Sequence, residues 1–157
     1  MSGVLSEGPF PRLALRDLDG RSQPLDEAWS RGDALVLIGH GDCRTTRLSL
    51  PYLDRIHRRR ARGAVRLVLQ DDAEAARVLV AELGLGLPVL LDEDPYPLAE
   101  ALALATVPTL FLVDGDGRIA RASEAFSRAD LEAVAERLGV AGPLFTAEDQ
   151  TPAFRPG

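Results

Sequence analysis

Residues 34–53 read ALVLIGHGDCRTTRLSLPYL, and this stretch decides the fold. It opens with a continuous apolar run, as expected of a strand that is buried on both faces of a sheet. A short break at residues 39–42 follows, and Cys43 then begins a helical pattern that extends to about Arg62. A helix N-terminus carries partial positive charge and unsatisfied N–H groups, so it favours a thiolate over a thiol. The stretch therefore predicts a strand, a tight turn and a reactive sulfur at the start of a helix.

Length, composition and charge restrict the class of protein. The chain has 157 residues, of which 46% are hydrophobic and 27% charged, which is typical of one soluble globular domain. A formal net charge of −6 and a pI of about 4.9 give a nucleic-acid role no global electrostatic support. No apolar run approaches the ~20 residues of a membrane-spanning helix, and the first residues lack a signal-peptide pattern. We therefore expect a cytoplasmic protein without nucleic-acid or membrane partners, and the sequence leaves its oligomeric state open.

Cys43 is the only cysteine, which excludes an intramolecular disulfide and a cysteine-rich metal site. A metal site made of His40, Asp42 and Cys43 would crowd its ligands into one short turn without further sulfur. We therefore expect no bound metal and no other cofactor.

Strand and helix patterns alternate along the chain. The expected elements are a hairpin around residues 19–20, strands at 34–38, 65–69, 88–91 and 109–113, helices at 43–62, 72–83 and 96–105, a second hairpin turning at 114–117, and a last helix from Ser127 to Leu138. This order predicts an α/β fold, a three-layer sandwich with a central mixed β-sheet and an N-terminal β-hairpin extension. We expect one domain over residues 1–139, with its core at about 9–139. Residues 140–157 are predicted to be an irregular tail that lies on the surface or is mobile.

Three segments carry a resemblance to a known family. Cys43 at a helix start is followed by Pro51, residues 106–109 read TVPT, and residues 111–119 read FLVDGDGRI. In this order and spacing they resemble the thioredoxin superfamily, in particular its redoxin and thiol-specific antioxidant (AhpC/TSA) branch. The resemblance covers about residues 9–139. It implies that Val107-Pro108 is the cis-proline loop, which lies beside the attacking cysteine in this family.

The resemblance also implies roles for particular residues. Cys43 would be the nucleophile, with Thr46 and His40 completing the catalytic site. Val107 and Pro108 would form a docking edge, because the backbone before the proline can pair with a peptide or glutathione in β fashion. Arg44 is assigned to substrate binding, and its charge favours a thiolate. The partners would be thiols and disulfides of proteins or of glutathione.

The sequence departs from the family at several of these positions. Thr46 stands where the second cysteine would be, so its hydroxyl can donate a hydrogen bond to a thiolate but cannot resolve a mixed disulfide. Asp42 replaces a common tryptophan, and its negative charge disfavours a thiolate. His40 is either a proton donor to the sulfur or a turn residue that merely packs. Val36 and His40 occupy the positions of the proline and threonine that bind peroxide in peroxiredoxins.

These observations leave three hypotheses. The leading one is a monothiol thiol-disulfide oxidoreductase or antioxidant protein that uses Cys43 and is resolved by an external thiol. The second is a redox-inactive binding module with the same fold, and the third is a one-cysteine peroxidase. We interpret the acidic runs at residues 71–72 and 92–94 as solvated caps and turns.

Overall fold

The structure is a computed structural model that describes residues 3–157. Its elements, in chain order, are β1 (Ala14–Asp17), β2 (Ser22–Pro24), the 3-10 helix η1 (Leu25–Trp29), β3 (Ala34–Gly39), α1 (Arg44–Arg59), β4 (Ala64–Leu69), α2 (Ala73–Leu83), β5 (Val89–Leu91), α3 (Pro97–Ala101), β6 (Thr109–Val113), β7 (Ile119–Glu124), β8 (Phe126–Ser127), α4 (Arg128–Arg137), the 3-10 helix η2 (Ala147–Asp149) and β9 (Phe154–Arg155). The predicted alternation is present, and β1 and β2 form the expected hairpin. None of the helices in this part of the chain is long and apolar enough to cross a membrane.

Seven strands form one mixed sheet in the order β2-β1-β5-β4-β3-β6-β7. The strands β3, β4 and β5 run parallel, whereas β1, β2, β6 and β7 pair antiparallel with their neighbours. β3 lies between β4 and β6, and every one of its residues is buried. A strand buried on both faces has no polar face, which explains why its sequence is continuously apolar.

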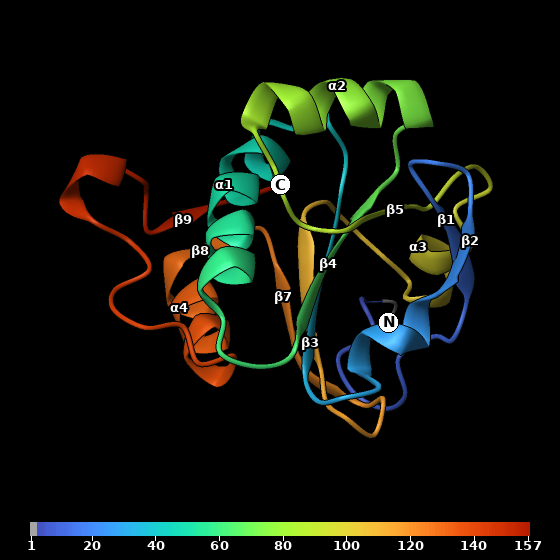
Figure 1. Cartoon of the computed structure of the whole chain (residues 1–157), viewed down its shortest axis with the longest axis horizontal. Coiled ribbons are helices and arrows are strands. Elements are labelled where there is room, and N and C mark those ends of the chain that lie inside the picture. Colours follow the sequence, from blue (N-terminus) through green and yellow to red (C-terminus); the bar gives the residue numbers. More distant parts are fainter. Residues whose placement is uncertain (1–2) are drawn as a thin grey trace.

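Helices cover both faces of the sheet, which confirms the three-layer α/β sandwich (Figure 1). Side chains of α1, α2 and α4 share one hydrophobic cluster with β3, β4 and β6. On the opposite face, η1 and α3 pack on a second cluster, in which Phe10 lies edge-on against Trp29 and Phe111. The two clusters fix the sheet between its helices, and the carboxyl end of β3 leads directly into the turn before α1.

The helix α1 is one element that runs unbroken through Pro51. It ends at Arg59, before the predicted end at Arg62, because Arg60 has an extended backbone. The Arg60 guanidinium donates to the His57 carbonyl oxygen at 2.7 Å, so it satisfies one of the free carbonyls of the last turn.

The helix α3 is much shorter than the helix predicted over residues 96–105. Ala103 has a φ of +51°, a left-handed conformation that ends a helix. The carboxylate of Asp92 accepts the N–H groups of Leu98 and Ala99, at 2.9 Å each, and is fully buried. The interpretation of residues 92–94 as a solvated turn is therefore wrong for Asp92, which is an internal cap.

Residues 140–157 are more ordered and more integral than the predicted surface arm. Leu144 and Phe145 are buried in the same cluster as α1 and α4. Phe145 stacks on Tyr52 of α1 at a ring-centroid distance of 4.6 Å. Beyond them, η2 and β9 are regular elements. The prediction of a surface tail rested on the turn-forming and acidic residues of this segment and therefore missed the two buried apolar side chains.

Candidate functional site

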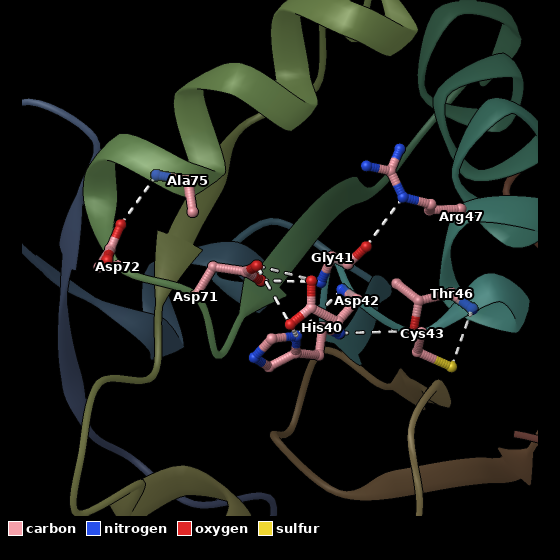
Figure 2. A network of polar contacts seen from close by, with 9 residues as sticks. All are labelled: His40, Gly41, Asp42, Cys43, Thr46, Arg47, Asp71, Asp72 and Ala75. Carbon is pink, nitrogen blue, oxygen red and sulfur yellow. Dashed lines mark hydrogen bonds and ion pairs between the residues drawn. The ribbon is translucent and has the colours of Figure 1, made fainter.

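Cys43 lies at the N-terminal cap of α1, where the sequence predicted it. Cys43 is half-buried, and its sulfur accepts the backbone N–H of Thr46 at 3.5 Å (Figure 2). The Cys43 N–H donates to the His40 carbonyl oxygen at 3.0 Å, which closes the turn between β3 and α1. The sulfur therefore faces the positive end of the helix through a direct contact with a first-turn N–H.

The loop before β6 lies against this sulfur. The Val107-Pro108 peptide bond is cis, and the Cys43 thiol is 3.5 Å from the Val107 carbonyl oxygen, to which it donates. Pro108 is buried, whereas Val107 is half-buried. The structure thus brings the cysteine beside the residue pair that the sequence assigned to the docking edge.

Thr46 contributes to the site through its backbone rather than its side chain. Its hydroxyl accepts the His40 N–H at 3.4 Å and is fully buried, whereas its own N–H contacts the sulfur. A Cβ at Gly39 would lie 2.5 Å from the Thr46 methyl group, so a glycine at the end of β3 lets the first turn of α1 approach. The expected hydroxyl-to-sulfur hydrogen bond is not the contact that the structure shows.

His40 faces away from the sulfur. Its Nδ1 accepts the Asp42 N–H at 3.1 Å and lies 3.8 Å from the buried carboxylate of Asp71 (Figure 2). Within residues 3–157, no hydrogen bond joins the imidazole to Cys43. This geometry favours the structural interpretation of His40, as a residue that shapes the turn.

Arg44 is exposed, and its side chain forms no hydrogen bond or ion pair with the described part of the chain. Asp42 is exposed as well, with a side chain that is 97% accessible. The two charges adjacent to Cys43 are therefore opposite in sign and both solvated, and water screens them strongly.

Asp71 and Arg47 hold the turn, and the sequence analysis did not assign them to the site. Both carboxylate oxygens of Asp71 accept the Gly41 N–H, at 2.9 and 3.1 Å, and the Arg47 Nε donates to the Gly41 carbonyl oxygen at 2.8 Å. A Cβ at Gly41 would lie 2.7 Å from Asp71 Oδ2, so this close contact needs a glycine. Gly41 is thus clamped on both sides of its backbone, two residues before the sulfur.

The sequence signal for this clamp is the pair of adjacent carboxylates at residues 71–72. Their interpretation as solvated residues is wrong for Asp71, which is buried. Asp71 follows a buried strand, and Asp72 follows Asp71. Asp72 is the exposed cap of α2 and accepts the Ala75 N–H at 2.8 Å, as predicted, whereas Asp71 is buried. Only one of two adjacent carboxylates was needed as the cap, so the other was free to act elsewhere.

Within residues 3–157, no cluster of three or more His, Cys, Asp or Glu side chains has a geometry that could hold an ion. His40, Asp42 and Cys43 are neighbours in sequence but do not converge.

Solved structures share this arrangement of sheet, helices and loop. The thioredoxin domain of a thiol-disulfide oxidoreductase from Bacteroides vulgatus matches with a TM-score of 0.72 and 22% identity, over 86% of this chain and 98% of that one. A thiol:disulfide interchange protein from Bacteroides sp. matches with a TM-score of 0.73 and 19% identity, over 88% and 93% of the two chains. The chain has the thioredoxin fold. A secreted disulfide oxidoreductase from Mycobacterium tuberculosis matches with a TM-score of 0.67 and 15% identity, over 81% and 96%.

The comparisons with sequences give no match. No protein-family model fits the chain, and no curated protein resembles it at a significant level. At identities this low, the solved structures show a common thioredoxin fold, and function has to be argued from the site itself. In this thioredoxin fold the site contains one cysteine sulfur, the cis-proline loop beside it and the clamped turn that precedes Cys43.

Proposed function

We propose that the protein is a monothiol thiol-disulfide oxidoreductase with Cys43 as its nucleophile. The observation that carries the proposal is the position of the sulfur, which accepts a first-turn N–H of α1 and lies 3.5 Å from the Val107 carbonyl oxygen. The first contact directs a backbone N–H of the helix N-terminus at the sulfur that would attack a disulfide. The second places the sulfur beside a backbone edge that can position an extended substrate.

The reaction divides into two exchanges. The Cys43 thiolate attacks one sulfur of a substrate disulfide, the substrate S–S bond breaks, and its other sulfur leaves as a thiolate. The product is a mixed disulfide between Cys43 and the substrate. A second thiolate, from glutathione or a protein, then attacks the substrate sulfur of this mixed disulfide and releases the Cys43 thiolate. The net result is an exchange in which the other substrate sulfur leaves as a thiolate, the external thiol joins the attacked substrate sulfur in a new disulfide, and Cys43 is unchanged at the end.

The need for an external thiol follows from Thr46. A resolving cysteine would occupy the position of Thr46 in the first turn of α1. A threonine hydroxyl cannot attack the mixed disulfide as a thiolate does. The chain has no other cysteine that could do so.

The reactivity of Cys43 tests this proposal. We expect iodoacetamide to modify Cys43 faster than it modifies glutathione at pH 7, because the sulfur lies at a helix N-terminus and accepts a first-turn N–H. Cys43→Ser should abolish modification and turnover of a mixed glutathione disulfide. A rate equal to that of glutathione or below it would contradict the proposal and favour a redox-inactive binding module.

A further assay separates the proposal from a peroxidase. If the protein consumes hydroperoxide with an external thiol but does not exchange disulfides, the peroxidase hypothesis is correct instead. We expect the opposite result, because Val36 and His40 stand where a peroxidase would hold the peroxide.

A further inference from the structure

The last residues that the structure describes return to the cysteine. β9 pairs antiparallel with β8, with Phe126 opposite Arg155 and Ser127 opposite Phe154. The Arg128 N–H donates to the Ala153 carbonyl oxygen at 3.0 Å, which extends this pairing. In Figure 1 the chain passes from η2 through β9 to a point beside the first turn of α1, where the C label stands. Residues 153–157, which we call the strap, are therefore an extended strand that ends at the site.

The strap contacts both sides of the docking edge. The Thr45 hydroxyl, in the first turn of α1, donates to the Pro156 carbonyl oxygen at 2.6 Å. Gly157 lies against the cis-proline loop so closely that a Cβ there would overlap the Val107 carbonyl oxygen and approach Thr106 Oγ1 to 2.7 Å. The same Val107 oxygen accepts the Cys43 thiol. The strap thus lies where an extended peptide would have to lie in order to bring its sulfur to Cys43.

The contacts of the strap are made mainly by its backbone. All of residues 152–157 are exposed, and Phe154 in particular is 59% exposed. Backbone pairing with a strand edge is the mode by which proteins bind extended peptides of varied sequence. Such a contact buries little apolar area, so another strand can replace it.

The segment that precedes the strap is anchored firmly. Arg55 donates to both carboxylate oxygens of Asp149, at 3.0 and 3.2 Å, and to the Leu144 carbonyl oxygen at 2.8 Å. Leu144 and Phe145 are buried. The strap therefore has a fixed base and a weakly held end. Its base keeps the strap close to the docking edge when the end is displaced.

From this geometry we propose that residues 153–157 act as an internal substrate mimic, which occupies the peptide-docking site formed by β8, the first turn of α1 and the cis-proline loop. This inference rests on the proposed function of Cys43. A tethered strand competes at an effective concentration on the order of millimolar, so it excludes weakly binding peptides and yields to tight ones. Small disulfides need no strand pairing in order to react with Cys43, which is half-buried, and are affected much less. The strap therefore selects for protein substrates that supply an extended strand with enough affinity to displace it.

Gly157→Val provides the test, because the added side chain cannot fit beside the Val107 carbonyl and expels the strap from the docking site. The matched control is Gly3→Val, since a Cβ at Gly3 meets nothing within 4 Å. Two probes report on Cys43 in the chain of residues 1–157. One is dithiodipyridine, and the other is an extended peptide whose single cysteine is disulfide-bonded to thionitrobenzoate. Attack by Cys43 on the peptide sulfur releases coloured thionitrobenzoate.

We expect Gly157→Val to raise the rate with the peptide about tenfold and to change the rate with dithiodipyridine less than about twofold. Gly3→Val should change neither rate. Equal effects of Gly157→Val on both probes, or no effect on either, would overturn the strap proposal while leaving the proposed function intact.

A separate measurement covers the case in which Cys43 reacts with neither probe and the proposed function fails. Amide hydrogen exchange of residue 155 should be faster in Gly157→Val than in the parent chain, and an added peptide without cysteine should bind to Gly157→Val more tightly than to the parent. If amide exchange at residue 155 and peptide binding were the same in Gly157→Val and in the parent chain, the strap would not compete with peptides for the docking site.

Discussion

At the scale of single residues, the site depends on Gly41, which is chemically inert. Its N–H is held by Asp71 and its carbonyl oxygen by Arg47, so the backbone two residues before Cys43 is held on both sides. Arg47 is itself held by Glu82, at 3.1 Å. The clamp therefore fixes the turn that leads to Cys43 through residues that do not touch the sulfur.

Replacement of Asp71 tests this clamp. Asp71→Asn leaves only one acceptor oxygen and removes the charge, so we expect a loss of about 1–3 kcal/mol in the free energy of unfolding, measured with urea. Asp72→Asn is the matched control, because Asn caps a helix as well as Asp does and should cost only a few tenths of a kcal/mol. Losses of equal size in the two variants would contradict a special role for the buried carboxylate.

Thr46→Cys tests the assignment of the second cysteine position. Residues three apart in a helical turn bring their Cβ atoms to roughly 5–6 Å, within reach of a disulfide after small adjustments. We therefore expect this variant to lose both free thiols on treatment with oxidised glutathione and to recover them with dithiothreitol. Thr45→Cys should form no intramolecular disulfide, because the Thr45 side chain faces Pro156, and mass spectrometry should find any thiol that it loses as a mixed disulfide with glutathione. A failure of Thr46→Cys to form the disulfide would contradict the assignment.

At the scale of elements, residues 140–149 connect α4 to the segment that leads into the strap. One ion pair, between Arg55 of α1 and Asp149, anchors this connection. The Arg55 guanidinium, with help from the Thr146 N–H, lowers the pKa of Asp149 to about 2. A carboxylate with a lowered folded-state pKa stabilises the folded chain above its unfolded pKa of ~3.9, and this stabilisation disappears as the pH falls through the folded value. The anchor is therefore complete at neutral pH and is lost only in strong acid.

Asp149→Asn should destabilise the protein by about 1 kcal/mol at pH 7 and accelerate amide exchange over residues 150–157. The stability difference from the parent chain should be constant from about pH 9 to 5 and should shrink as the pH falls from about 4 towards 2. Glu148→Gln serves as the control, since Glu148 is exposed and forms no hydrogen bond or ion pair within residues 3–157. A difference that persists unchanged at about pH 2 would show that the ion pair is not its cause.

The elements themselves could largely be predicted from the sequence. The strand expected at residues 109–113 is β6 with the same bounds, and Ser127 caps α4 as expected. These elements follow from local patterns of apolar residues, turn residues and caps. α3 was too long in the prediction, because nothing in the local sequence signals that Ala103 adopts a left-handed conformation.

The site was predictable only in part, for a related reason. Cys43, Val107 and Pro108 are marked by residue type and spacing, and the structure brings them together. The clamp of Asp71 on Gly41 and the return of the strap are long-range contacts, which involve backbone groups that every residue carries. A second carboxylate after β4 indicated that one of the two could make such a contact, but a backbone partner leaves no mark in residue type, so the sequence could not specify which group Asp71 would hold.

At the scale of the whole molecule, His57 links stability to pH. Burial lowers the pKa of His57, and the neighbouring Arg60 lowers it further. Arg60 can only donate, so at 3.3 Å the His57 Nδ1 must accept from it, which favours the neutral ring. The unfolded chain, with an ordinary histidine pKa of ~6.5, then binds a proton more readily than the folded chain does.

The free energy of unfolding should therefore fall as the pH drops below about 6.5, with its slope set by proton uptake at His57 on unfolding. His57→Gln should flatten this part of the profile, measured by urea unfolding at a series of pH values. Arg60→Gln should reduce the slope only partly, because burial is the larger cause of the shift. A profile for His57→Gln as steep as that of the parent would refute the assignment to His57.

The strap has a consequence for how this chain can vary among its relatives. Because residues 153–156 are held by their main chain and point their side chains into solvent, mutation can change most of them at little cost. The length of the connection from Asp149 and the absence of a side chain at Gly157 cannot change so freely. Natural selection on this segment is thus expected to preserve the number of residues between Asp149 and Gly157 and the glycine itself. The residues between them should vary, a pattern that a comparison of orthologous sequences would display.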